Sequence, residues 1–150
     1  MEMKFNQLHE GISCNCLSED VSEDTTSVFM RTLKRGHSEL KAFDVLSHHQ
    51  RRIPMHSKNP SCKEVCRHRG LSIDKLQSGN ESKIIANYVR AFNIKPKISR
   101  SFCKFRLKEG AGLVEHTPSH NDFHHTLYKS DGLTLDHIEV LNVAPINVSH

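Results

Sequence analysis

The stretch SRSFCKFRL, residues 99–107, alternates apolar and polar side chains and indicates the fold class. Cys103, Phe105 and Leu107 fall on one face of an extended chain, and the two basic residues between them fall on the opposite face. Such alternation is typical of a strand with one buried and one solvated side, as found in antiparallel sheets. The stretch therefore predicts a strand of an antiparallel sheet.

Further strands are expected on both sides of this stretch, because short alternating segments are separated by Gly, Pro, Ser and Asp. The expected strands cover residues 27–33, 71–74, 112–116, 124–130 and 136–143. Most of the strands therefore follow residue 99, whereas one lies early in the chain at residues 27–33 and a short one lies at residues 71–74.

Three helices are expected before residue 99. The clearest covers residues 60–69, because Asn59 can cap it, Pro60 suits its first turn and Gly70 suits its end. Apolar spacing predicts the others at residues 39–48 and 80–93. We therefore expect a single α+β domain over residues 27–150, with about three early helices and a mostly antiparallel sheet, and a partly ordered leader over residues 1–26.

The composition favours a folded domain, and the sequence shows no sign of export from the cell. The chain has 150 residues, of which 36% are hydrophobic and 25% are charged, and its formal net charge is +4. Neither an apolar run of about 18 residues nor a secretion signal is visible, so we expect a cytoplasmic protein without a membrane partner. The cysteines are odd in number and are therefore expected to be reduced thiols: Cys14, Cys16, Cys62, Cys66 and Cys103.

A histidine-rich run, EHTPSHNDFHHTLY, occupies residues 115–128. His116, His120 and His124 are spaced by four, which on a helix would suit a metal, but Pro118 opposes a continuous helix. The cysteine spacings also do not match a zinc knuckle, so no metal site is predicted. The run is expected to be a polar loop, or to line a ligand cleft in which histidines bind phosphate or move protons.

A basic surface is expected around residues 51–69, which include Arg51, Arg52, Lys63, Arg67 and Arg69. It is a candidate phosphate-binding or nucleic-acid-binding surface, although no aromatic residues interleave there to stack bases. The sequence contains no Walker loop, GxGxxG, GxSxG or HExxH motif, so no common catalytic signature assigns a reaction.

Four blocks resemble a recurrent type of small, stand-alone bacterial protein, a resemblance that implies no particular chemistry. The blocks are FMR at residues 29–31, CRHRGLS at 66–72, LKEGAGLVEHTP at 107–118 and HHT at 124–126. Together they extend over most of the chain after residue 27.

The order of an arginine-bearing strand, a serine-bearing middle strand, a lysine–glycine turn and the late segment DHIEVL resembles the minimal ADP-ribosyltransferase scaffold. This resemblance implies that Arg31 contacts the phosphates of NAD and that Glu139 is the catalytic carboxylate. It places the serine element either at Ser72, beside Arg69 in RGLS, or at Ser99 and Ser101. The sequence departs from the family's pattern at position 137, where His stands in place of a glutamate found in many members.

Three functions are consistent with these patterns. The first is an NAD-using transferase, or a relative that only binds the nucleotide, in which the first and last strands lie side by side. Arg31, Glu139 and the histidines at 116, 120 and 124 would then share one cleft. The second is a non-enzymatic interaction module, a partner or inhibitor in bacterial or phage conflict. The third is a nucleic-acid-binding protein that uses the basic surface.

Overall fold

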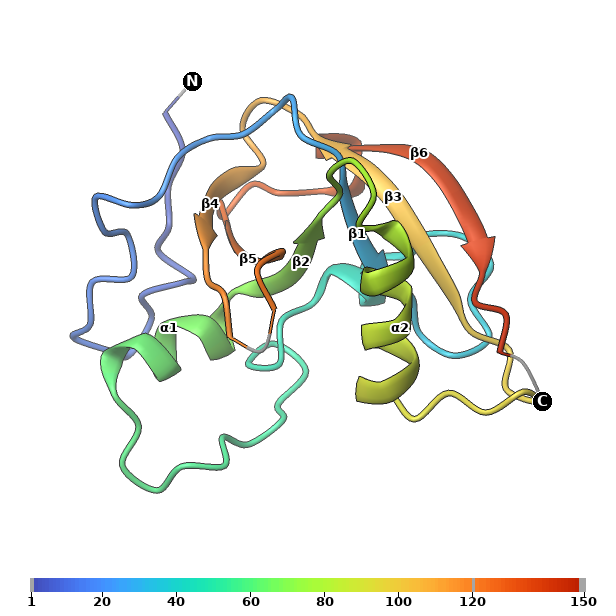
Figure 1. The fold of residues 1–150 in the computed structure, drawn as a ribbon. Helices are drawn as coiled ribbons and strands as arrows, with labels where there is room; N and C mark the ends of the chain where they lie inside the picture. The colour runs from blue at the N-terminus through green and yellow to red at the C-terminus, as the bar shows by residue number, and fades with distance from the viewer. Residues whose placement is uncertain (1, 120, 149–150) are drawn as a thin grey trace.

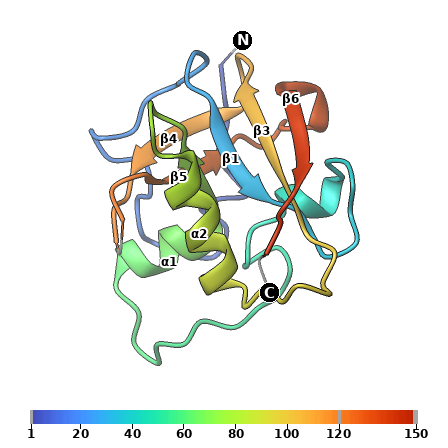
Figure 2. The same cartoon turned by 45° about the vertical axis from the view of Figure 1, so that its right-hand side comes forward.

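The computed structural model describes residues 2–119 and 121–148 and shows an α+β fold built on a six-stranded sheet (Figures 1 and 2). The strand order is β4-β5-β2-β1-β3-β6, and all neighbouring strands are antiparallel. In chain order the elements are β1 (Phe29–Thr32), the 3-10 helix η1 (Ala42–Val45), α1 (Cys62–Arg69), β2 (Leu71–Lys75), α2 (Glu81–Ala91), β3 (Ser101–Leu107), β4 (Gly112–His116), β5 (His124–Lys129), the 3-10 helix η2 (Leu135–His137) and β6 (Ile138–Pro145).

The α+β class and the antiparallel sheet are confirmed, but the expected number of helices is wrong. The described residues contain two α-helices, and the helix expected over residues 39–48 is reduced to the single turn of η1. The Asp44 carboxylate accepts hydrogen bonds from the backbone N–H groups of Lys34 and Lys41. These contacts hold the segment in a compact turn, and the chain is already extended at Leu46.

Two apolar layers sandwich the sheet. On one face, α2 packs Ile84 and Tyr88 against Met30 of β1 and Phe102 of β3. The alternate residues of the same strands form the opposite layer, which includes Phe29. Both faces of the central strands are therefore buried, which leaves the strand ends and the loops as the places where polar side chains meet solvent.

The N-terminal strap, residues 2–22, is attached to α1 by two disulfides, Cys14–Cys62 and Cys16–Cys66. The spacings match, because residues four apart lie on one face of a helix and residues two apart lie on one side of an extended chain. In Figure 1 the strap runs beside α1 and the β4 edge of the sheet.

The expectation that the cysteines are reduced is therefore wrong for four of them, and Cys103 is the free, buried cysteine of the described residues. An odd count of cysteines does not show which of them meet in the fold. Disulfides persist mainly in oxidising compartments, so these two do not support the expected cytoplasmic location, which stays a prediction. Across the described residues, no helix has the length and apolar character needed to traverse a bilayer.

Candidate functional site

The sheet opens between its two central strands. β1 and β2 pair only at Phe29↔Lys75 and Met30↔Asp74. β1 pairs with β3 along its whole length, while residues 71–74 of β2 pair with β5. We call this opening the β1–β2 split.

The side chain of Arg31 bridges the split. Its Nε donates to the carbonyl oxygen of Asp44 at 2.7 Å, and its Nη1 donates to the carbonyl oxygen of Ser72 at 2.7 Å. Burial lowers the pKa of Arg31 to about 10, so the guanidinium stays charged at neutral pH. Both groups that accept its hydrogen bonds are neutral carbonyls, and the nearby carboxylates of Asp44 and Asp74 offset part of its charge without a hydrogen bond to it.

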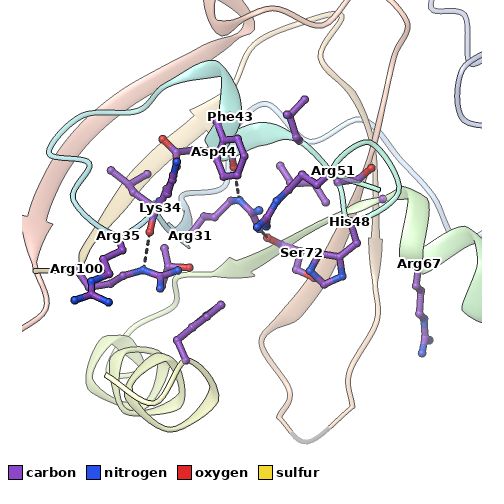
Figure 3. A pocket seen from close by; sticks show the side chains of 17 residues that line it. Arg31, Lys34, Arg35, Phe43, Asp44, His48, Arg51, Arg67, Ser72 and Arg100 are labelled. Carbon is purple, nitrogen blue, oxygen red and sulfur yellow. Dashed lines mark hydrogen bonds between the residues drawn. The ribbon is translucent and has the colours of Figure 1, made fainter. Parts of the chain in front are cut away.

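A pocket of about 360 Å³ opens beside Arg31 (Figure 3). Its volume is within the range of small-molecule sites. Further cations from separate parts of the chain line it: Lys34, Arg35, Arg51, Arg67 and Arg100. Figure 3 shows Arg35 and Arg100 toward one end, Arg51 and His48 toward the other, and Arg31 between them. An anion in this pocket would be attracted from several sides.

Asp44 is the one acidic residue that the described residues place in the pocket lining. Its side chain is buried and accepts from the backbone N–H groups of Lys34 and Lys41, and its Oδ2 lies 2.9 Å from His37 Nδ1. The carboxylate is therefore engaged by the protein itself. It offsets part of the positive field but is not placed to act on a ligand.

Aromatic rings accompany the cations. The Lys34 ammonium and the Arg51 guanidinium lie 4.8 and 4.7 Å from the centroid of Phe43. Phe92, at the end of α2, is 47% exposed, and the Arg100 guanidinium lies 4.7 Å from its centroid. Flat rings beside guanidinium groups can stack against the base of a nucleotide whose phosphates meet the cations.

The charge of Arg31 acts beyond the pocket. Lys129, on β5, donates to the carbonyl oxygen of Val45 at 2.6 Å and to Gln50 Oε1 at 2.5 Å. Burial, with a further contribution from the Arg31 charge, lowers the pKa of Lys129 to about 8. Lys129 therefore adds a second cation close to Arg31, outside the pocket lining.

Glu139 does not line the pocket. The expectation that the first and last strands are neighbours is wrong. β3 lies between β1 and β6; Arg31 is opposite Cys103, whereas Glu139 is opposite Arg106. Cys103 and Arg106 are three positions apart on one strand and therefore face opposite sides of the sheet. Glu139 is exposed and forms a 3.9 Å ion pair with Arg106.

The histidine run also lies apart from the pocket lining. His116 and His125 stack with centroids 4.7 Å apart, and His116 Nε2 lies 2.6 Å from the carbonyl oxygen of Asp122. His124 Nδ1 lies 2.8 Å from Thr117 Oγ1, in the hairpin between β4 and β5. These rings interact with one another and with their own hairpin. The predicted role of His120 concerns a residue outside the described ones.

No group of three or more His, Cys, Asp or Glu side chains within residues 2–119 and 121–148 is arranged to hold a metal ion. The side chains that dominate the pocket are cationic, so the site suits an anion. The prediction that the protein holds no zinc is untested, and the binding of NAD also stays a prediction.

Of the predicted serine elements, Ser72 is brought to the pocket, where its carbonyl oxygen meets Arg31. Ser99 and Ser101 flank a residue that sequence reasoning missed, Arg100, whose Nε donates to the carbonyl oxygen of Leu33 at 2.7 Å. Arg69 turns away to the N-terminal strap, where its Nη1 donates to the carbonyl oxygen of Glu10.

Gly70 joins α1 to β2 at the rim of the pocket. A Cβ at this position would lie 2.3 Å from Thr126 Cγ2, so the residue must be small for β2 to approach β5.

Comparison of the chain with family models, with curated proteins and with solved structures finds no match. The interpretation of the pocket around Arg31 and Ser72 therefore depends on the geometry of this structure alone.

Proposed function

We propose that the protein binds a phosphate-bearing nucleotide, with NAD as the first ligand to test, in the pocket at the β1–β2 split. The half-buried guanidinium of Arg31 carries this proposal, since the two groups that accept its hydrogen bonds are uncharged. A desolvated guanidinium is a strong phosphate ligand. The resemblance to ADP-ribosyltransferases assigns the phosphate contact to the same arginine and supports the choice of NAD.

We propose binding without ADP-ribosyl transfer. Transfer of the resembled type needs a carboxylate that stabilises positive charge developing on the ribose. Glu139 lies on the other side of the sheet from Arg31, and the Asp44 carboxylate is engaged by backbone N–H groups. A nucleotide in this pocket would be held rather than turned over.

The test is titration calorimetry at low salt with NAD, ADP-ribose, ADP and adenosine. The three phosphate-bearing compounds should bind and adenosine should not. Arg35→Gln removes an exposed cation of the pocket and should weaken binding with little effect on folding. Arg106→Gln is the matched control, because Arg106 lies on the opposite face. Equal affinity for adenosine and ADP, or equal losses in both variants, would contradict the proposal.

A second candidate, the non-enzymatic interaction module, is favoured by the edge strand β6. Val140 and Leu141 of this strand are 44% and 40% exposed. An exposed edge can accept a strand from a partner, with backbone hydrogen bonds supplying affinity. Val140→Lys should abolish a complex formed in this way and leave nucleotide binding unchanged. A complex that survives this substitution would contradict the second candidate.

A further inference from the structure

The positive charge of the chain is concentrated in residues 45–73, which we call the basic segment. It contains six Lys or Arg and one Asp or Glu, so its formal net charge of +5 exceeds the +4 of the whole chain. The single acid, Glu64, is held in the cap of α1, where its Oε1 accepts from the backbone N–H of Ser61 at 3.2 Å. The cations are Arg51, Arg52, Lys58, Lys63, Arg67 and Arg69.

The basic segment begins inside the pocket and continues outside it. Arg51 and Arg67 line the pocket, whereas Arg52, Lys58 and Lys63 are exposed beyond that lining. In Figures 1 and 2 the loop that leads to α1 projects from the body of the protein. A single nucleotide would occupy the pocket without reaching the outer cations, whereas a chain of phosphates would engage both.

Flat rings lie among these cations. The ring of His68 packs edge-on against His48 and His49, with centroids 6.0 and 6.1 Å away. Burial lowers the pKa of both His48 and His49, with nearby His68 and Arg69 respectively adding to the effect, which favours the neutral form of both rings. Together with exposed Phe92 at the other end of the pocket, they offer faces for unpaired bases.

These features favour nucleic acid over the other polyanions. A lipid surface would be met by cations beside exposed apolar side chains, but Ile53 and Met55 in the projecting loop are half-buried. An acidic peptide would make no use of the stacking faces. A concave pocket also fits the end of a single strand better than the outer surface of a duplex.

We propose that the nucleotide held in the pocket is the terminal residue of a single-stranded nucleic acid, whose following phosphates lie along the basic segment. The inference rests on the proposed function, because the strand end would occupy the same pocket. It adds the outer cations, which a free nucleotide does not reach.

Fluorescence anisotropy with a 5′-phosphorylated oligothymidine of about 12 nucleotides tests this proposal. The triple variant Arg52→Gln, Lys58→Gln, Lys63→Gln should weaken oligonucleotide binding at least about tenfold and lower the salt slope by about 2, since each lost phosphate contact removes roughly 0.7. The same variant should bind ADP as the wild-type protein does. ADP should also displace the oligonucleotide.

The matched control is Lys4→Gln, Lys83→Gln, Lys108→Gln, which removes three exposed charges elsewhere and should leave both affinities unchanged. Oligonucleotide binding that both triple variants weaken equally, or that ADP does not displace, overturns the inference. If ADP binds and the oligonucleotide does not, the inference fails and the proposed function stands; if ADP does not bind, the proposed function itself fails. Tighter binding to phosphatidylserine vesicles than to the oligonucleotide would assign the basic segment to a membrane instead.

Discussion

The guanidinium of Arg31 and the carbonyl oxygen of Ser72 lie 2.7 Å apart and connect β1 to β2 where the backbone hydrogen bonds between these strands have ended. The side chain replaces part of a missing strand pairing and also forms a charged wall of the pocket. One residue therefore serves both the stability of the sheet and the proposed binding of phosphate.

Arg31→Lys should destabilise the fold. A lysine keeps the charge but cannot reach the carbonyl oxygens of Asp44 and Ser72 together, so one of these acceptors loses its donor. The expected loss in the free energy of unfolding is about 1–3 kcal/mol. Urea denaturation measures it, with Arg106→Lys as a control that should change little. An unaltered midpoint would contradict a bridging role.

Glu139→Gln should leave nucleotide binding unchanged, because Glu139 and Arg31 face opposite sides of the sheet. Its ion pair with Arg106 is long and exposed, so stability should also change by less than about 1 kcal/mol. Calorimetric titration with NAD and thermal melting check both expectations. A large loss of affinity would show that β6 contributes to the site after all.

Reduction of the disulfides should lower thermal stability. The bonds close loops with sequence separations of 48 and 50 residues, and one such cross-link is worth about 2–4 kcal/mol. The second should add less, because both join the same two segments. Thermal melts of Cys14→Ser/Cys62→Ser and of the protein in reductant measure these effects.

Alkylation of the unfolded, unreduced protein is the accompanying check. It should label one cysteine per chain, Cys103, because the other four are paired. Labelling of all five would show that the thiols are reduced, as the sequence predicted.

Asp74 should make stability depend on pH. Its carboxylate is buried and accepts a hydrogen bond from the Tyr88 hydroxyl at 2.6 Å; burial raises its pKa above the ordinary 3.8. At Asp74 the folded state therefore binds a proton more tightly than the unfolded state. The stability that this tighter proton binding contributes is lost as the pH rises through the raised pKa. Asp74→Asn should gain stability relative to wild type as the pH increases from 3 to 7. Parallel melting curves for the two proteins over this range would contradict it.

The strands and their faces could be predicted from the sequence, whereas their order could not. Alternation places Cys103, Phe105 and Leu107 on one face correctly. It contains no information on whether β1 lies beside β6 or beside β3, and the pairing of Arg31 with Glu139 failed for that reason. The helix expected near residue 43 failed because Asp44 binds backbone N–H groups from outside the turn, a contact that apolar spacing does not encode.

The lining of the candidate pocket could be predicted in part. The family resemblance named Arg31 and Ser72, and charge drew attention to Arg51 and Arg67; all four residues line the pocket. Arg100 and Phe92 were missed because each belongs to a segment whose local pattern is ordinary. Only the folding of residues 92–100 against the end of β1 brings them to the pocket.

The covalent attachment of the N-terminal strap to α1 has a mechanical consequence. α1 runs into β2 through Gly70, and Gly70 and Ser72 both line the pocket. A displacement of residues 14–16 would therefore be passed through the two cross-links and α1 to the part of the pocket lining that Gly70 and Ser72 form.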